Sequence, residues 1–227
     1  IDNVTKRADG TVNAYPQGMV VRGDRMYQTW VWRTTPNAAT NFDLCYAFST
    51  DSGNTWRNGA NVVIGSRGAP NDTDQLINAD DDGLAGISLG EGSIRNNGSM
   101  TMDENKNIHV VVSGPGGNPV HYMWTAKRDA SGVPMDHGGV WSSARYAPSL
   151  GKLVAGPNNR LYLVTKSGLH ETDASNPVWT TARVADAPAG LIDGPSNQVV
   201  DTSRVKHGVI SVVGQNDGTT ITCIDYH

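Results

Sequence analysis

The chain has 227 residues, of which 26 are glycine and 11 are proline, and 37% of the residues are hydrophobic. The many turn formers argue against long helices, whereas six Trp and seven Tyr supply enough large apolar side chains for a packed β-sheet core. Because the net charge is −4 and no apolar run is long enough to cross a bilayer, we expect neither a nucleic-acid partner nor a membrane partner.

Short apolar runs separated by turn residues recur in four groups along the chain. The first group comprises residues 19–21, 26–32 and 44–48, and the second comprises 100–102, 108–112 and 120–124. The third comprises 153–155, 161–164 and 168–170, and the fourth comprises 199–200, 208–213 and 219–224. Groups of three or four short strands at intervals of about 40–50 residues are typical of β-propeller blades. A βαβ architecture is not indicated, because no connecting segment has a 3.6-residue apolar period.

We therefore predict an all-β fold that forms a portion of a β-propeller with about four blades. The predicted blades span residues 10–60, 95–142, 148–185 and 195–227, and a long polar insertion separates the first two at 59–95. A terminal blade cannot bury both of its faces alone, so these blades must close into a ring or join further blades. We favour the second arrangement.

The turn after the third run reads Ser49-Thr50-Asp51-Ser52-Gly53-Asn54-Thr55-Trp56 and matches the Asp-box pattern Ser-x-Asp-x-Gly-x-Thr-Trp. We expect Asp51 to accept backbone hydrogen bonds, Gly53 to take a positive φ, and Trp56 to pack between strands. Looser versions of the pattern begin at Asp129, ahead of Trp141, and at Asp173, ahead of Trp179. The Asp box therefore indicates a fold rather than a catalytic site.

The two cysteines, Cys45 and Cys223, both lie in apolar, strand-like runs. We expect two free, buried thiols that behave as small hydrophobic residues. A disulfide between them is the alternative, since sequence does not reveal geometry.

With the Asp box, residues 30–36, residues 40–46 and the segment from Asn97 to His109, the sequence resembles the Asp-box (BNR-type) propellers that include ulvan lyases and rhamnose–glucuronate lyases. Specific motifs carry the resemblance over roughly residues 10–125. In the remainder, only the regular spacing of the predicted blades matches. Members of this family usually have about seven blades. The resemblance therefore implies that this chain is the C-terminal portion of a larger propeller, whose remaining N-terminal blades are its expected partner.

The resemblance implies a lyase that cleaves an acidic polysaccharide by β-elimination next to a uronic acid. Such a site must neutralise the carboxylate, remove the C5 proton and protonate the departing oxygen. Arg33 matches the arginine that neutralises the carboxylate and is our catalytic candidate, because a guanidinium is permanently charged and can grip a carboxylate with two bonds. The substrate-binding candidates are Asn13, Tyr15, Arg95 and Asn97, and Tyr15 is also a candidate base or acid. A structural Arg33, stacked on Trp30 or paired with Asp43, is the alternative.

The histidines depart from the family pattern. Where the family has its catalytic histidine pair, this chain has Arg95 and Asn96 at the first place and Ser113-Gly114-Pro115 near the second. We expect the base and the acid to lie outside this chain, and we expect His109 and His121 to be ordinary packed or hydrogen-bonded strand residues. The missing histidines favour a second hypothesis, a non-catalytic glycan-binding propeller.

A sialidase-like glycoside hydrolase is the third functional hypothesis, since it shares the Asp box. Its arginine triad and its Tyr–Glu nucleophile cannot be identified here, because none of Glu91, Glu104 and Glu171 flanks a tyrosine.

No cofactor or metal site is predicted, apart from a possible structural Ca²⁺. Asp72, Asp74 and Asp80-Asp81-Asp82 offer oxygen ligands, but they lack the glycine and the alternation of an EF-hand loop, so a solvated acidic loop is the simpler interpretation. A polysaccharide substrate implies a secreted or periplasmic protein. Residues 1–4 do not resemble a signal peptide, so for an exported protein we expect the signal to have been removed already.

Overall fold

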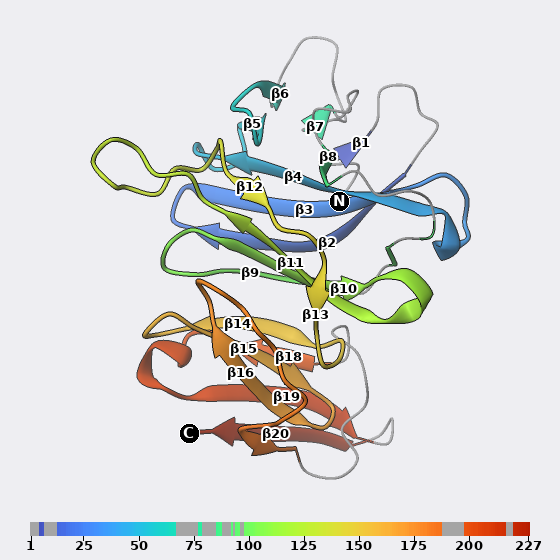
Figure 1. Cartoon of the computed structure of the whole chain (residues 1–227), viewed down its shortest axis with the longest axis vertical. Helices are drawn as coiled ribbons and strands as arrows, with labels where there is room; N and C mark the ends of the chain where they lie inside the picture. Colours follow the sequence, from blue (N-terminus) through green and yellow to red (C-terminus); the bar gives the residue numbers. More distant parts are fainter. Residues whose placement is uncertain are drawn as a thin grey trace. The chain divides into compact units, whose positions relative to one another are not determined.

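A computed structural model of the chain describes residues 5–6, 13–66, 77–78, 85–87, 92, 94–95, 98–187, 198–216 and 220–227. These residues form β-strands and short 3-10 helices, as the composition predicts (Figure 1). The chain divides into two compact units. The first contains residues 1–96, 114–116 and 125–141, and the second contains 97–113, 117–124 and 142–227. In the part of the chain that the structure describes, no helix is long and apolar enough to span a membrane.

The first unit is built on one large sheet. Its strands are β1 (Thr5–Lys6), β2 (Asn13–Arg22), β3 (Arg25–Arg33), β4 (Asn41–Ser49), β5 (Thr55–Asn58), β6 (Val63–Ser66), β7 (Ile77–Asn78) and β8 (Ala85–Ile87). They follow the order β6-β5-β4-β3-β2-β1-β7, β8 also pairs with β4, and every pair is antiparallel except β1 with β7. Strands β6, β7 and β8 lie in the segment expected to be a polar insertion, so parts of that segment extend the sheet.

Strand β2 begins well before the apolar run that predicted it, at Asn13 rather than near Met19. A register shift between Pro16 and Gly18 lets the strand continue through the proline region, where periodicity alone gives no strand signal. One face of the sheet carries an apolar cluster whose buried members are Trp30, Trp32, Cys45, Ala47 and Trp56. The 3-10 helix η1 (Ala38–Thr40) joins β3 to β4, and β12 (Val140–Trp141) also belongs to this unit.

The second unit contains three smaller antiparallel sheets. Strands β9 (Ser99–Met102), β10 (Ile108–Ser113), β11 (Pro119–Thr125) and β13 (Arg145–Tyr146) are four of the five strands of the first, and β12 is the fifth. Strands β14 (Lys152–Gly156), β15 (Arg160–Thr165), β16 (Gly168–Asp173) and β17 (Ala185–Asp186) form the next. Strands β18 (Gln198–Asp201), β19 (Ile210–Asn216) and β20 (Thr220–Tyr226) form the last. Among the described residues, η4 (Val205–His207) is a 3-10 helix of this unit, and η3 (Pro115–Gly117) is another 3-10 helix of the chain.

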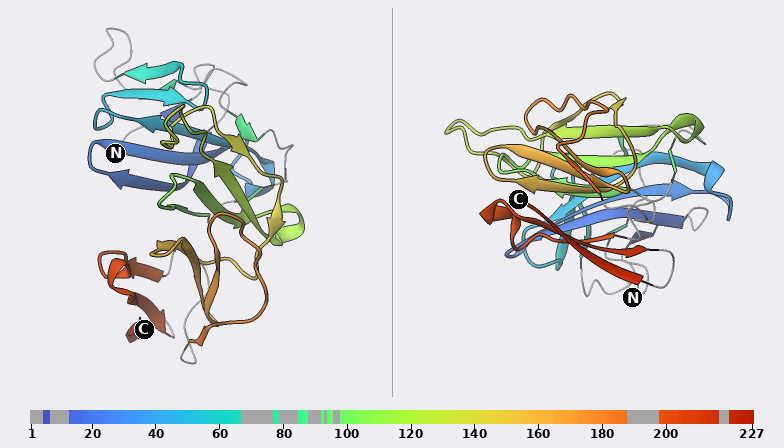
Figure 2. Two further views of the ribbon diagram at one scale, coloured as in Figure 1. Left: turned by 60° about the vertical axis from the view of Figure 1, so that its left-hand side comes forward. Right: turned by 90° about the horizontal axis from the view of Figure 1, so that it is seen from below.

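Apolar side chains join these sheets. Val111 of β10 shares a buried cluster with Leu153, Leu161 and Leu163 of the β14–β17 sheet. The other face of that sheet packs on the β18–β20 sheet, which lies beside it (Figure 2). The four groups of strands predicted from the sequence thus fall into four sheets, and the all-β prediction is confirmed.

The Asp box forms the turn that its residues predict. Oδ1 of Asp51 accepts hydrogen bonds from the Thr55 backbone N–H and the Ser49 hydroxyl, each 2.8 Å long. Gly53 has φ +82° and Trp56 is buried, as expected. The version at Asp129 uses the same device, because its Oδ1 accepts from the N–H of Val133, four residues on, at 2.9 Å. Asp173 Oδ1 instead accepts from the N–H of Ser175, two residues on, at 2.7 Å. In all three turns an Asp side chain therefore accepts a local backbone N–H.

The prediction for the cysteines is correct for Cys45 and wrong for Cys223. Both thiols are free, but Cys45 is buried and Cys223 is exposed. Cys223 lies opposite Val213 on the outer face of the β18–β20 sheet, whereas the next residue, Ile224, packs into the apolar cluster beneath. An apolar run does not reveal which face of a strand is covered, because successive side chains alternate.

Candidate functional site

Arg33 is the last residue of β3, and the sheet places two asparagines directly beside it. Asn13 of β2 pairs with Arg33 on one side, and Asn41 of β4 pairs with it on the other. Because Tyr15 lies two residues after Asn13 on β2, its side chain belongs to the same face of the sheet. Antiparallel pairing therefore gathers Arg33 with Asn13 and Tyr15, two of the candidates selected from sequence.

The Arg33 guanidinium is held from two directions. Its Nε–H donates a 2.7 Å hydrogen bond to Oδ1 of Asn41, and Nη1–H donates a longer one, 3.4 Å, to the Pro36 carbonyl. The Tyr15 ring lies against the guanidinium, with its centroid 3.6 Å from Cζ. Arg33 is only 5% exposed, and Nη2 is closed to solvent without a hydrogen-bond partner. One edge of the guanidinium is thus anchored, while the opposite nitrogen is unsatisfied.

The charge of Arg33 is also uncompensated. Among the residues that the structure describes, no carboxylate forms an ion pair with it. Stacking on the Tyr15 ring and donation to two neutral oxygens offset part of the desolvation cost, but a buried cation normally needs an anion. The site is therefore electrostatically suited to an anionic group, and a carboxylate can accept from Nη2.

The aromatic ring that contacts Arg33 is Tyr15, and not Trp30 as the structural alternative supposed. Residues 30 and 33 are an odd number of positions apart on a regular β2–β3 ladder, so their side chains point to opposite faces. Trp30 packs edge-on against Trp32 in the apolar cluster, with ring centroids 5.7 Å apart. The sequence alone does not show on which face of the sheet the Arg33 side chain lies.

One of the two remaining substrate-binding candidates makes no described contact with this group, and the other lies outside the described residues. Arg95 is half-buried in the first unit, and no hydrogen bond or ion pair among the described residues connects it to Arg33. Asn97 lies outside the described residues, as do the aspartates considered for Ca²⁺ at positions 72, 74 and 80–82. In the part of the chain that is described, no group of three or more His, Cys, Asp or Glu is arranged to hold a metal.

Sequence reasoning missed Asn41, the residue that orients Arg33. The sequence did contain a signal for it. Arg33 and Asn41 flank the loop between two strand-like runs, and residues in such positions lie opposite each other in a β-hairpin. The side chain of Asn41 is fully buried, so its hydrogen bond to Nε–H is made in a dry environment. There it is expected to hold the guanidinium more rigidly than a solvent-exposed contact could.

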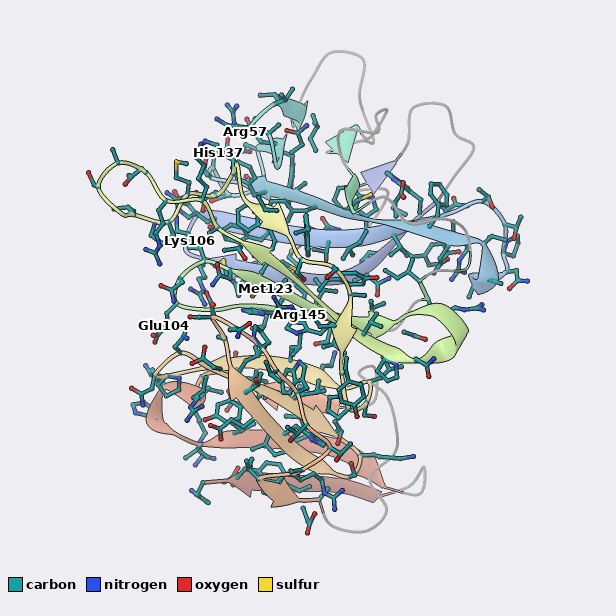
Figure 3. The ribbon with its side chains drawn as sticks, viewed as in Figure 1. Arg57, Glu104, Lys106, Met123, His137 and Arg145 are labelled. Carbon is teal, nitrogen blue, oxygen red and sulfur yellow. The ribbon has the colours of Figure 1, made fainter. Side chains whose placement is uncertain are left out.

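His109 and His121 are packed strand residues of the second unit, as predicted. They form a buried chain in which Trp179 Nε1 is 3.1 Å from His121 Nδ1 and His121 Nε2 is 3.3 Å from His109 Nδ1. His109 Nε2 is in turn 3.3 Å from Oδ2 of Asp103. Burial, the nearby His109 and the charge of Arg145 (labelled in Figure 3) hold the pKa of His121 well below its ordinary value. These fully buried side chains stabilise the second unit and lack the exposure that a substrate site requires.

The four sheets and the Asp-box turns define a protein of the Asp-box, all-β class. A family model described as "BNR repeat-containing family member" matches residues 2–132, which is more than half of the chain, and the chain belongs to this family. No curated protein matches the sequence. The family match covers the Arg33 site and the Asp box in the first unit.

Proposed function

We propose that the chain binds the carboxylate of an acidic polysaccharide at Arg33 and forms part of a lyase that cleaves a uronate-containing glycan such as ulvan. The observation that carries the proposal is the buried guanidinium of Arg33, which has an unsatisfied Nη2 and no counter-ion among the described residues. A uronate carboxylate supplies both the missing acceptor and the missing charge. The same proposal includes a complete propeller of about seven blades, of which this chain is a portion.

In the proposed reaction the Arg33 guanidinium neutralises the uronate carboxylate, which makes the adjacent C5 proton acidic. A base removes this proton, its electron pair forms the C4–C5 double bond, and the C4–O bond breaks. An acid then protonates the leaving oxygen. The Tyr15 phenol is a candidate for one of these proton transfers because its ring contacts Arg33. The other group is expected on the remaining blades of the propeller.

Access to Arg33 requires a movement at the site, because Nη2 is closed to solvent. Tyr15 is half-buried and lies over the guanidinium, so rotation of its side chain is the simplest opening. In this proposal the sugar displaces the Tyr15 ring from Arg33, and the gain from pairing the buried charge offsets the lost stacking. The protein then works outside the cytoplasm, secreted or periplasmic, where its polysaccharide substrate occurs, and the reaction needs no cofactor.

A non-catalytic glycan-binding propeller is the second candidate, and one observation favours it. The two strand histidines are committed to a buried network, and among the described residues no histidine contacts Arg33. The same carboxylate contact would then serve binding alone.

Ultraviolet absorbance during incubation of the complete propeller, with its remaining blades, with ulvan separates the candidates, since elimination creates a conjugated, unsaturated uronate, whereas hydrolysis and binding do not. We expect Arg33→Ala to lower kcat about 10²- to 10³-fold, and Arg33→Lys to recover little because a point charge cannot reproduce the planar guanidinium. Arg22→Ala, at an exposed position on the same sheet, is the matched control and should keep wild-type activity.

The assay includes the thermal midpoint of each variant and its retention on immobilised ulvan. Loss of elimination with an unchanged midpoint supports the lyase. A wild-type protein that binds ulvan through Arg33 without any rise in absorbance supports the glycan-binding module instead. If Arg33→Ala retains wild-type kcat and binding, both proposals fail, and a joint loss of activity and several degrees of stability marks Arg33 as structural.

A further inference from the structure

A hollow of about 160 Å³ lies in the second unit, between the β14–β17 sheet and the β18–β20 sheet. Tyr162, Leu169 and Glu171 line it from the first of these sheets, and Ile210 and Tyr226 line it from the second. All of these residues lie in one compact unit. The hollow is separate from the Arg33 site, which belongs to the first unit.

The register explains why a hollow forms there. Val164 and Leu169 are paired neighbours on β15 and β16, and their side chains fill the space against the facing sheet. The pair Tyr162 and Glu171, two positions further along the same face, is longer and more polar. Gly208 also lines the hollow, and a Cβ atom at this position would meet nothing within 4 Å. The space against the facing sheet is therefore less completely filled at this row than at Val164.

The walls of the hollow combine two aromatic rings with polar groups. Oε1 of Glu171 is 3.0 Å from Nε of Arg160, so the carboxylate already has a cationic partner. Tyr226 is only 8% exposed, and its buried hydroxyl has no hydrogen-bond partner. A buried hydroxyl without a partner is costly, and such groups are normally satisfied by water or by a ligand.

The size and the chemistry restrict what the hollow can hold. A cavity of about 150 Å³ accommodates a single six-membered ring. Because Arg160 compensates Glu171, the walls favour a neutral guest over an ion. Tyrosine rings provide flat apolar surface, and the Glu171 carboxylate offers hydrogen bonds at the edge, which the buried Tyr226 hydroxyl can join once its ring rotates. One neutral sugar ring, with an apolar C–H face and hydroxyl groups around its rim, meets all of these requirements.

We propose that the hollow between the β14–β17 and β18–β20 sheets is a binding site for one neutral sugar residue. The C–H face of the ring packs on the tyrosines, and its hydroxyl groups bond with the Glu171 carboxylate. The Tyr226 hydroxyl is closed to solvent, so a small rotation of its ring brings it into contact with the sugar. The few contacts available to a single ring set the affinity in the millimolar range. The site does not depend on Arg33, so it stands or fails independently of the proposed carboxylate contact.

Ligand-observed NMR titration of the full 227-residue chain with methyl β-glucoside tests the site, with methyl glucuronide and phenol as comparison probes. Val184→Trp places a large ring at the rim of the hollow, at an exposed position that tolerates it. Val178→Trp is the matched control, because Val178 is similarly exposed and does not line the hollow. Tyr226→Phe removes the unsatisfied hydroxyl while keeping the ring.

We expect saturable binding of the glucoside by the wild type and by Val178→Trp, no saturation with Val184→Trp, and a Kd raised about five- to tenfold by Tyr226→Phe. The glucuronide should bind more weakly than the glucoside. Absence of saturable glucoside binding, or equal binding by Val184→Trp, overturns the proposal. Binding of phenol in preference to the glucoside overturns it as well, because the hollow is then an apolar cavity. Stabilisation by Tyr226→Phe without any sugar binding also overturns the proposal, because the hydroxyl is then simply buried without a partner and its removal relieves that cost.

Discussion

Trp179 donates its indole Nε1–H to Nδ1 of His121 across 3.1 Å, and this contact sets the protonation of a buried chain of side chains. Since an indole can only donate, Nδ1 of His121 must accept, and a neutral His121 then carries its proton on Nε2. That N–H donates to Nδ1 of His109, whose own Nε2–H donates to Asp103. This tautomer assignment satisfies every bond in the chain with both rings neutral. An additional proton on either ring breaks at least one bond.

The chain of histidines predicts acid sensitivity of the second unit. The pKa of His121 is depressed in the folded protein, so the unfolded state binds a proton first as the pH falls. The stability contributed by neutral His121 is therefore complete above about pH 6.5 and decreases by about 1.4 kcal/mol per pH unit below it. Asp103 affects the stability of the folded protein in a lower pH range. Burial raises its pKa, but hydrogen bonds from His109 and Asn107 outweigh that effect, so its contribution is lost only below about pH 4.

Urea unfolding of the wild type and His121→Gln at pH 7.5 and 5.5 measures this dependence. The wild type should lose about 1.4 kcal/mol more between the two pH values than His121→Gln, whatever the stability of the variant at neutral pH. His207→Gln, at an exposed position, should follow the wild type. Equal losses in the wild type and His121→Gln would contradict the neutral-chain assignment.

The contact between Asn41 and Arg33 predicts opposite effects on stability and on ligand binding. In Asn41→Asp a carboxylate occupies the position that now accepts the Nε–H bond, so the buried guanidinium gains a counter-ion. We expect an unchanged or higher thermal midpoint, because the charge is compensated, and at least about tenfold weaker binding of a uronate oligosaccharide, because the new carboxylate competes with the ligand.

Two further variants serve as comparisons for Asn41→Asp. Calorimetry measures the thermal midpoint of each variant, and titration measures its affinity for the uronate oligosaccharide. Asn41→Ala should lower both the midpoint and the affinity, since it removes the anchor and leaves Nε–H unsatisfied. Asn13→Asp puts the same charge on the opposite neighbour of Arg33 at an exposed position, where solvent screens it, so its effect on binding should be smaller. Wild-type affinity in Asn41→Asp would show that the ligand does not bind at Arg33.

The Asp box predicts a graded loss of stability at Asp51. Asp51→Ala removes the acceptor for the Thr55 N–H and the Ser49 hydroxyl, and we expect it to lower the free energy of unfolding by about 1 kcal/mol. Asp51→Asn retains an oxygen at Oδ1 and should lose less. Asp24→Ala changes an exposed aspartate in the adjacent β2–β3 turn and serves as the control in the same denaturation series. A loss in Asp24→Ala as large as that in Asp51→Ala would argue against a specific turn contribution.

The two thiols should differ sharply in their reaction with a maleimide. Cys223 is exposed and should react in the native protein, whereas Cys45 is fully buried in the tryptophan cluster and should react only after unfolding. Mass spectrometry should find one label on the native chain and a second after denaturant is added. Cys223→Ser should remain unlabelled until it unfolds. Rapid native labelling of Cys223→Ser would show that the first sheet opens around Cys45.

The sequence by itself determined the features that depend on neighbouring residues. Short apolar runs between turn residues identify the strands, and Asp51, Gly53 and Trp56 specify their turn through local hydrogen bonds and one positive φ. The motif around Arg33 selected it as the candidate for binding a carboxylate. These signals need no knowledge of which strands lie side by side.

Only the tertiary structure decided which distant residues meet. Strand register places Asn41 and Tyr15 beside Arg33, and it opposes Tyr162 to Glu171, although none of these pairs is adjacent in sequence. The stacking of sheets leaves Cys223 exposed while Ile224 is covered. Register and stacking are set by the burial of whole sheet faces and by bulges, and a shift of one residue would turn every side chain of a strand to the other face. The partners of Arg33 are therefore a property of the folded sheet and not of any single segment of the chain.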